Sequence, residues 1–202
     1  MRSNVTFGAG TGGHSHADTL SVVAFHEGAE ALIDPGTGTY SDPAVRERFR
    51  ATAAHNTISI RSGSIQSGAM QNVEQASSRG AFRWTEMPVV KLLHQNSNEM
   101  DDIIDGVCRY RGFTHRRTVV LRKSGTLVVV DRVDGPAGDW CVEQRWLCAE
   151  AFSREGLSSD PPAYEEPAER SSEYGSSIPA RRWVARRSGP LPAVLVAVLD
   201  FE

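Results

Sequence analysis

The chain has 202 residues, of which 40% are hydrophobic and 23% charged, so it can bury a core and is not expected to be disordered throughout. Its 22 Lys and Arg against 25 Asp and Glu give a net charge of -3, which offers no electrostatic case for binding nucleic acid or an anionic membrane. No apolar run approaches the roughly 18 residues of a membrane-spanning helix. Met1 to Asn4 begin no apolar stretch, so no signal peptide is predicted in this sequence.

Hydrophobic residues recur in short runs separated by Gly, Pro, Asn and Asp, a pattern typical of β-strands joined by turns. The predicted strands are, in chain order, residues 20–25, 29–33, 57–61, 81–85, 89–93, 118–121, 127–133, 140–147, 183–187 and 193–201. One short helix is predicted at residues 43–50, where Pro43 suits the first helical position and Asp42 the N-cap. Many short strands with almost no helix predict an all-β protein, an antiparallel β-sandwich of the supersandwich-like kind.

The strand pattern predicts one domain with one interruption. Residues 1–152 are expected to form the core of the sandwich. Residues 153–178 are rich in Ser, Glu, Pro and Gly, which predicts a surface loop or a partly disordered excursion. Residues 179–202 then supply the closing strands of the same domain.

Ionisable residues gather just before the first predicted strand, in the segment Gly-His-Ser-His-Ala-Asp at residues 13–18. His14, His16 and Asp18 alternate along the chain, so they share one face of an extended backbone. Polar groups placed so close to an apolar strand are costly if they are buried without partners. A solvated loop is the simpler alternative, since histidines are often bystanders.

Asp34 and His55 add two further ionisable groups, each at one end of a predicted strand. Adjacent strands of one sheet would bring both residues close to His16. Two imidazoles and one carboxylate suit a zinc ion and leave a fourth position open. From the residues alone, a metal site and a polar cluster without metal remain equally open.

Tyr40 and the arginines of the predicted helix are the other candidates. Tyr40 is either a packing residue or a proton-transfer group. Arg46, Arg48 and Arg50 predict a solvated basic face, on which Arg50 is our candidate for binding an anionic substrate.

Several motifs carry, in their order, a resemblance to a known family. They are GHSHAD at 13–18, LIDPGT at 32–37, RATAAHNT at 50–57, HRRTVV at 115–120 and VVVDRV at 128–133. Together they resemble the C-terminal β-sandwich domain of the heparinase II/III-like polysaccharide lyases. The resemblance covers residues 5 to 150.

The resemblance implies a lyase whose full-length members carry an N-terminal (α/α) toroid, with the active site between toroid and sandwich. It implies that His14 is catalytic and that His16, Asp34 and His55 hold a mainly structural zinc ion. Some members use a tyrosine between the second and third motifs, and Tyr40 is the tyrosine in that interval. The implied partners are an acidic polysaccharide and the toroid, which would be needed for full activity, and the implied location is periplasmic or extracellular.

The implied reaction is β-elimination on a polymer that contains uronic acids, such as a glycosaminoglycan or alginate. The uronate carboxylate must be neutralised, a base must remove the C5 proton, and an acid must protonate the leaving O4.

Two other functions compete with this one. A cupin-type metal protein shares the His-x-His pattern, but it needs a glutamate soon after it, and the first glutamate here is Glu27. A non-catalytic carbohydrate-binding or assembly sandwich is compatible with the same fold, because fold does not dictate function.

Overall fold

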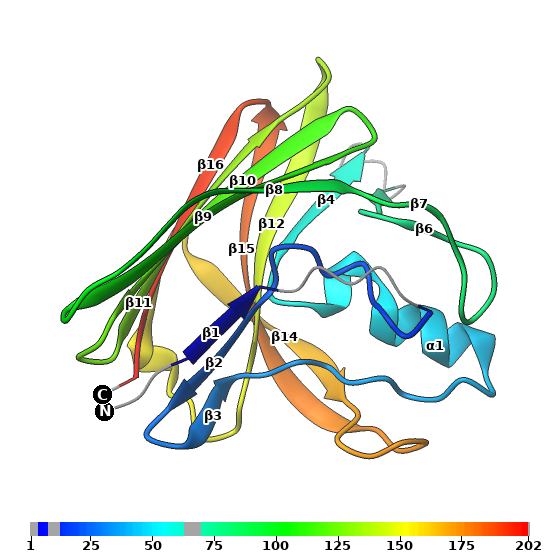
Figure 1. The fold of residues 1–202 in the computed structure, drawn as a ribbon. Coiled ribbons are helices and arrows are strands. Elements are labelled where there is room, and N and C mark those ends of the chain that lie inside the picture. Colours follow the sequence, from blue (N-terminus) through cyan, green and yellow to red (C-terminus); the bar gives the residue numbers. More distant parts are fainter. Residues whose placement is uncertain (1–3, 8–12, 63–69, 202) are drawn as a thin grey trace.

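A computed structural model describes residues 4–7, 13–62 and 70–201 of the chain. Its strands form two large antiparallel sheets that pack face to face, together with a small two-stranded sheet (Figure 1). The predicted all-β sandwich is therefore confirmed. Among the described residues no helix is long and apolar enough to cross a membrane. The prediction that no signal peptide is present rests on Met1 to Asn4, of which residues 1–3 lie outside the described part.

The first sheet contains β1 (Asn4–Phe7), β2 (Val22–His26), β3 (Ala29–Leu32), β4 (Ile58–Ser62), β5 (Gln71–Val73), β12 (Asp139–Cys148), β14 (Ala163–Arg170) and β15 (Ile178–Pro190). The second sheet contains β8 (Val89–Ser97), β9 (Asp101–Tyr110), β10 (Phe113–Arg122), β11 (Thr126–Asp134), β13 (Leu157–Asp160) and β16 (Ala193–Asp200). The remaining elements are the paired strands β6 (Ser77–Ser78) and β7 (Trp84–Glu86), the helix α1 (Pro43–Arg50), and the 3-10 turns η1 (Thr52–Ala54) and η3 (Arg154–Gly156).

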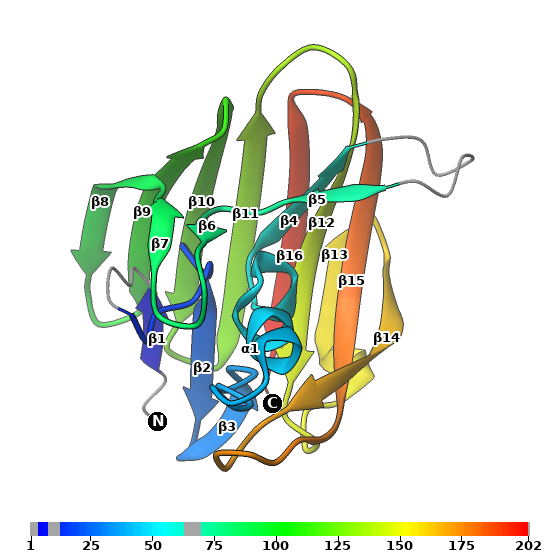
Figure 2. The same ribbon diagram turned by 90° about the vertical axis from the view of Figure 1, so that its right-hand side faces the viewer.

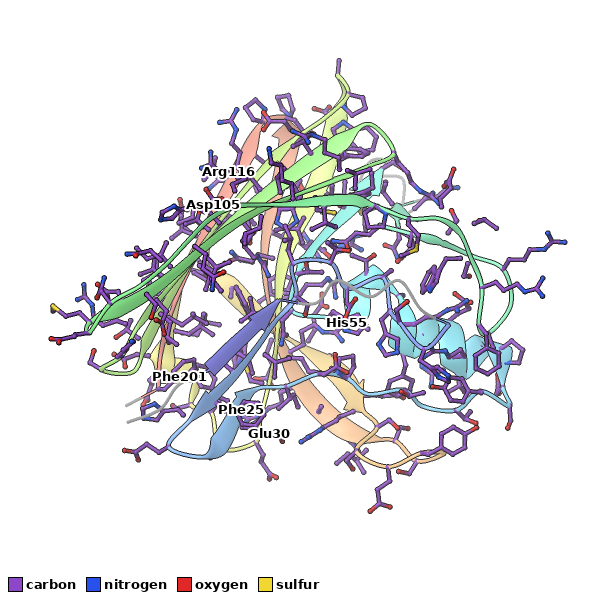
Figure 3. The ribbon with its side chains drawn as sticks, viewed as in Figure 1. Phe25, Glu30, His55, Asp105, Arg116 and Phe201 are labelled. Carbon is purple, nitrogen blue, oxygen red and sulfur yellow. The ribbon has the colours of Figure 1, made fainter. Side chains whose placement is uncertain are left out.

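Alternating burial fixes which face of each strand meets the core. On β10 and β16 every second residue is buried, as expected for strands with one face on the core and one in solvent. Trp146 of the first sheet packs with Leu127 and Leu199 of the second in one hydrophobic cluster. Arg116 and Asp105, by contrast, pair on the outer surface of the second sheet (Figure 3).

The helix α1 begins and ends as the sequence predicts. The Asp42 side chain accepts hydrogen bonds from the amides of Ala44 and Val45, and Pro43 occupies the first helical position. The helix lies in front of the first sheet, on the face away from the second sheet (Figure 2). This placement brings η1 and the residues after it against β12.

A carboxylate buried between the two sheets is fully paired. Asp131 is inaccessible to solvent, and its two oxygens accept hydrogen bonds from Nε and Nη2 of Arg117, at 2.7 and 2.8 Å. His115 Nε2 lies 2.7 Å from one oxygen, and the Gln144 amide donates to the other at 2.8 Å. A buried ion pair is tolerated only when its remaining polar atoms are also satisfied, and this carboxylate meets that condition.

The same arginine also holds two segments of the first sheet. Nη1 of Arg117 donates to the backbone carbonyls of Leu20 and Asn56, at 2.8 and 2.6 Å. The Asn56 side chain in turn donates to the carbonyls of Val22 and Ile33. Arg117 therefore links the second sheet to the segments that lead into β2 and β4.

The prediction of a loop or disordered excursion at 153–178 is wrong for two stretches. β13 pairs with β16 at an edge of the second sheet, and β14 pairs with β15 at an edge of the first. Most side chains of these two edge strands are exposed or half-buried, so polar residues are tolerated there and the composition of this interval resembles that of a loop.

Replacing Arg117 with Met should lower the free energy of unfolding by about 3–5 kcal/mol, because Asp131 would remain buried without its ionic partner. The exposed Arg132, which pairs with Asp134 on the surface, provides the control. Arg132→Met should cost at most about 1 kcal/mol. Urea unfolding followed by tryptophan fluorescence measures both, and equal losses in the two variants would contradict the prediction.

Acid should destabilise the fold through His115 and Asp131. Burial lowers the pKa of His115, and the pKa of Asp131 is also lowered because Arg117 and His115 outweigh the effect of burial. Both groups bind fewer protons in the folded state, so their contributions to stability are lost as the pH falls. The loss begins below about pH 6.5 for His115 and below about pH 4 for Asp131, the values of the unfolded chain.

The variant His115→Gln isolates the first of these two losses. From about pH 7.5 to about pH 5, urea unfolding should show a larger loss of stability in the wild type than in the variant, by about 1.4 kcal/mol per unit of pKa depression. Parallel pH dependences would show that His115 contributes nothing to acid sensitivity.

Candidate functional site

Three segments that are distant in sequence converge beside α1. They are the loop before β2, the turn after β3 and the residue that follows η1. The amide of Ala17 donates to the carbonyl of Arg50 at 2.9 Å, and the amide of Val22 donates to that of Asn56 at 3.3 Å. These backbone bonds fix the first segment against the end of α1 and against the start of β4.

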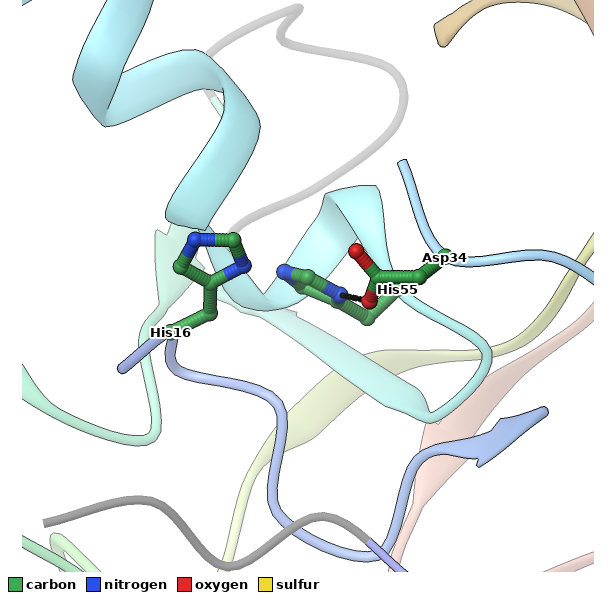
Figure 4. A group of neighbouring side chains, drawn as sticks. All are labelled: His16, Asp34 and His55. Atoms are coloured by element: carbon green, nitrogen blue, oxygen red, sulfur yellow. Dashed lines mark hydrogen bonds and ion pairs between the residues drawn. The ribbon is translucent and has the colours of Figure 1, made fainter. Parts of the chain in front are cut away.

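The structure brings the three predicted metal ligands together. His16, Asp34 and His55 each offer a ligand atom, and these atoms lie within 4.8 Å of one another. One ring nitrogen of His55 faces His16, and the other faces Asp34 (Figure 4). Nδ1 of His55 donates to Asp34 at 3.2 Å, whereas its buried Nε2 has no hydrogen-bond partner in the described structure. The unpaired nitrogen beside a second imidazole and a carboxylate fits a metal ion.

The charge states of this cluster also suit a metal. Burial, reinforced by the neighbouring His55, lowers the pKa of His16 to about 3. Burial alone would raise the pKa of Asp34, but the hydrogen bond from His55 outweighs it and the pKa is lowered. At neutral pH the cluster therefore presents a neutral imidazole at His16 and a carboxylate at Asp34, which are the forms that bind metal ions.

The turn after β3 holds Asp34 through a glycine. The amide of Gly36 donates to Asp34 Oδ1 at 2.8 Å, and Gly36 has a φ of 82°. A Cβ atom at this position would lie 2.0 Å from the carbonyl oxygen of Ser171, in the turn between β14 and β15. Only glycine fits so close to this backbone. The backbone amide of Ser171 also donates to the carbonyl of Pro35 at 2.7 Å, which holds the two turns together.

The two predicted catalytic residues are in direct contact. Nδ1 of His14 lies 2.9 Å from the hydroxyl oxygen of Tyr40, and the two rings meet edge to face. Phe82 packs against both rings, and Tyr174 lies against Tyr40. When the Tyr40 oxygen accepts from Nδ1, Nε2 of the exposed His14 has a free lone pair. When the hydroxyl donates instead, Nε2 carries a proton and can donate to an anion.

Arg46 joins this pair to the candidate metal ligands, a role that the sequence did not predict. Its Nη1 donates to Nε2 of His16 at 2.8 Å, and its guanidinium lies 4.9 Å from the ring centre of Tyr40. Arg46 is inaccessible to solvent, so the predicted solvated basic face is wrong at this position. The available signal was the four-residue spacing from Arg50, with Phe49 on the same side of the helix.

Arg50 does not occupy the predicted substrate-binding position. It is inaccessible to solvent, and its guanidinium donates to the carbonyls of Gly80 and Ala81 at 2.9 and 3.0 Å. It also lies 4.7 Å from the ring centre of Trp84. Arg50 therefore supports the segment that carries Phe82, and it presents no surface to a substrate.

Comparison with known proteins shows the family. A family model described as heparinase II/III-like, C-terminal matches residues 3–177. The chain belongs to this family. The resemblance predicted from the motifs is thereby confirmed. A search of curated protein sequences gave no match.

Solved structures with the same fold include a heparinase III gene product, with a TM-score of 0.71 and 16% identity over 98% of this chain and 32% of that one. Heparan sulfate lyase HepC from Pedobacter heparinus has a TM-score of 0.64 and 17% identity, over 93% and 31% of the two chains. A further heparinase III structure has a TM-score of 0.65 and 16% identity, over 92% of this chain and 30% of that one. At these identities the likeness establishes the fold. The chain spans about a third of the length of these proteins.

Replacing Arg46 with Met should lower the free energy of unfolding by about 1–3 kcal/mol, because His16 Nε2 would lose its donor in a partly buried position. Arg48→Met is the matched control, since Arg48 is exposed and pairs with Glu169 on the surface. The control should lose at most about 1 kcal/mol in urea unfolding. Hydrogen exchange of the Ala17 amide should quicken in the first variant only, and unchanged exchange there would contradict the assigned role.

Proposed function

We propose that this chain is the sandwich part of a polysaccharide lyase that cleaves a uronate-containing acidic polysaccharide by β-elimination. The observation that carries the proposal is the contact between His14 and Tyr40, exposed on one side and held by Arg46 on the other. Family membership supports the reaction class, and the names of the similar structures, heparinase III and heparan sulfate lyase, support an acidic glycan as substrate.

In this reaction a base removes the C5 proton of the uronate. The electrons of the C5–H bond form the C4–C5 double bond, and the C4–O4 bond breaks as O4 leaves with a proton. Nε2 of His14 accepts the C5 proton when Nδ1 is held as a donor to the Tyr40 oxygen. A positioned base of this kind contributes about 10²–10⁴-fold to the rate.

His16, Asp34 and His55 would hold a zinc ion next to this pair. When bound, the ion would supply structural cross-linking of the three segments. His14 is two residues from His16, so fixing the His16 ring also fixes the backbone that presents His14. Nη1 of Arg46 donates to Nε2 of the same ring, so zinc binding by His16 would require release of this hydrogen bond, because a neutral imidazole has a single lone pair on its ring nitrogens.

A toroid of the (α/α) type is the partner proposed for this sandwich. Described residues of this chain supply one exposed base and an aromatic surface at Tyr40, Phe82 and Tyr174. The groups that neutralise the uronate carboxylate and protonate O4 are assigned to the toroid. We place the whole protein in the periplasm or outside the cell, where an acidic polysaccharide would be met.

His14→Ala, in the protein that includes the toroid, should lower kcat/KM by about 10²–10⁴-fold, and Tyr40→Phe should lower it by about tenfold or more. The assay follows the ultraviolet absorbance of the unsaturated uronate product. His94→Ala, on the exposed strand β8, is the control and should keep full activity. Full activity of His14→Ala would end the catalytic assignment. Glycan binding without any cleavage by the wild type would favour a carbohydrate-binding sandwich.

The proposed zinc ion can be tested without any activity measurement. The purified chain, stripped with a chelator and reloaded, should bind about one zinc ion, measured by atomic absorption after dialysis. His55→Ala should lose this zinc, whereas His94→Ala should keep it. Added zinc should raise the melting temperature of the wild type, because an ion that binds only the folded state stabilises it. No retained zinc in the wild type would exclude the site.

A further inference from the structure

A cavity of about 840 Å³ opens on the face of the first sheet that carries α1. It lies between α1, η1 and the pair β14–β15, and neither His14 nor Tyr40 lines it. Trp183 of β15 packs into the core, so its neighbour Arg182 points to the opposite face. Figure 2 looks onto this face, where β14 forms the edge of the sheet.

The walls of the cavity are mainly apolar, with three charged side chains among them. Phe49, Pro167, Ile178 and Pro179 are among the apolar residues. The charged residues are Arg48, Glu169 and Arg182. Arg48 and Glu169 form an ion pair at 3.0 Å, and both are about half exposed, so their charges offset each other.

Arg182 lacks an ionic partner of its own. No carboxylate of the described residues lies within ion-pair distance of it, and Nη2 donates only to the carbonyl of Ala54, at 3.3 Å. Its Nε atom is buried without a hydrogen-bond partner. Its neighbour Arg145, in contrast, pairs with both Glu143 and Glu166.

The Nε atom of Arg182, buried without a hydrogen-bond partner, costs free energy that an anion bound to the guanidinium would recover. The planar guanidinium suits the two oxygens of a carboxylate or the oxygens of a sulfate. The surrounding apolar walls suit the ring that bears such a group. The unpaired charge and the apolar walls are therefore compatible with a ring that bears a single anionic group.

We propose that this cavity binds a small organic anion, a sugar-like ring that bears a carboxylate or a sulfate group, with Arg182 as its anion contact. The site is separate from the pair His14–Tyr40, and it does not depend on the proposed lyase activity.

Calorimetric titration of the intact chain with glucuronate tests the proposal, with glucose as the uncharged counterpart and inorganic sulfate as the free anion. Glucuronate should bind with a dissociation constant of about 1 mM, which is reasonable for a ligand of its size. Arg182→Gln should weaken binding by about tenfold or more. Arg181→Gln should leave it unchanged, since Arg181 donates to the carbonyl of Glu150 and does not line the cavity.

A second variant guards against misfolding of Arg182→Gln. Ser177 is exposed at the cavity wall, and Ser177→Asp adds a negative charge there without disturbing the core. Binding should weaken severalfold at low salt. Circular dichroism checks the fold of each variant.

The outcomes separate the two sources of the anionic group. Tighter binding of glucuronate than of sulfate, lost in the Arg182 variant, supports a sugar acid as ligand. If sulfate binds with the same dissociation constant as glucuronate, and Arg182→Gln weakens both, Arg182 is supported as the anion contact. The affinity then comes from the anionic group alone. Absence of saturable binding of either probe, or binding that neither variant weakens, overturns the proposal.

Discussion

The contact between Arg117 and Asp131 supports both the sandwich and the candidate site. Two nitrogens of the guanidinium satisfy a carboxylate between the sheets, and the third holds the carbonyls of Leu20 and Asn56. Asn56 directly follows His55, and its side-chain oxygen accepts the amide of Leu147 on β12. The ion pair buried between the sheets thus also determines where His55, one of the candidate metal ligands, lies.

The candidate site has a more buried half and an exposed half. The more buried half is the cluster of His16, Asp34 and His55, in which His55 is completely buried and the Asp34 side chain is partly exposed. The exposed half is His14 with Tyr40, bordered by aromatic rings. Arg46 contacts both halves, since it donates to His16 and lies against the ring of Tyr40. Such support from surrounding side chains is what precise placement of a reactive group requires.

Much of the fold followed from sequence because alternating apolar residues and turn residues are local signals. The helix at 43–50 and its Asp42 cap were predicted on that basis, and the structure confirms both. β9 was missed, because Asp101, Asp102 and Asp105 are unfavourable in an isolated strand. These carboxylates pair with basic residues nearby, for example Asp105 with Arg116 on β10, and such pairs appear only after the strands are aligned.

The site followed from sequence to the extent that residue type alone indicated chemistry. His14, Tyr40, His16, Asp34 and His55 were singled out for their chemistry or their motifs, and the fold brings them into two neighbouring groups. The burial of Arg46 and Arg50, by contrast, depends on tertiary packing. A helix of this length can expose or bury its arginines, and here the segments at 13–18 and 80–84 cover them.

The close approach of Gly36 to Ser171 has an evolutionary consequence. Hairpin turns commonly accept insertions, but lengthening the turn between β14 and β15 near Ser171 would shift the backbone against which the Asp34 turn rests. Family members that keep this arrangement should therefore vary little in loop length at that point, even though it lies more than a hundred residues from the histidines in sequence. Engineered fusions or circular permutations are better placed in turns at the far end of the sandwich.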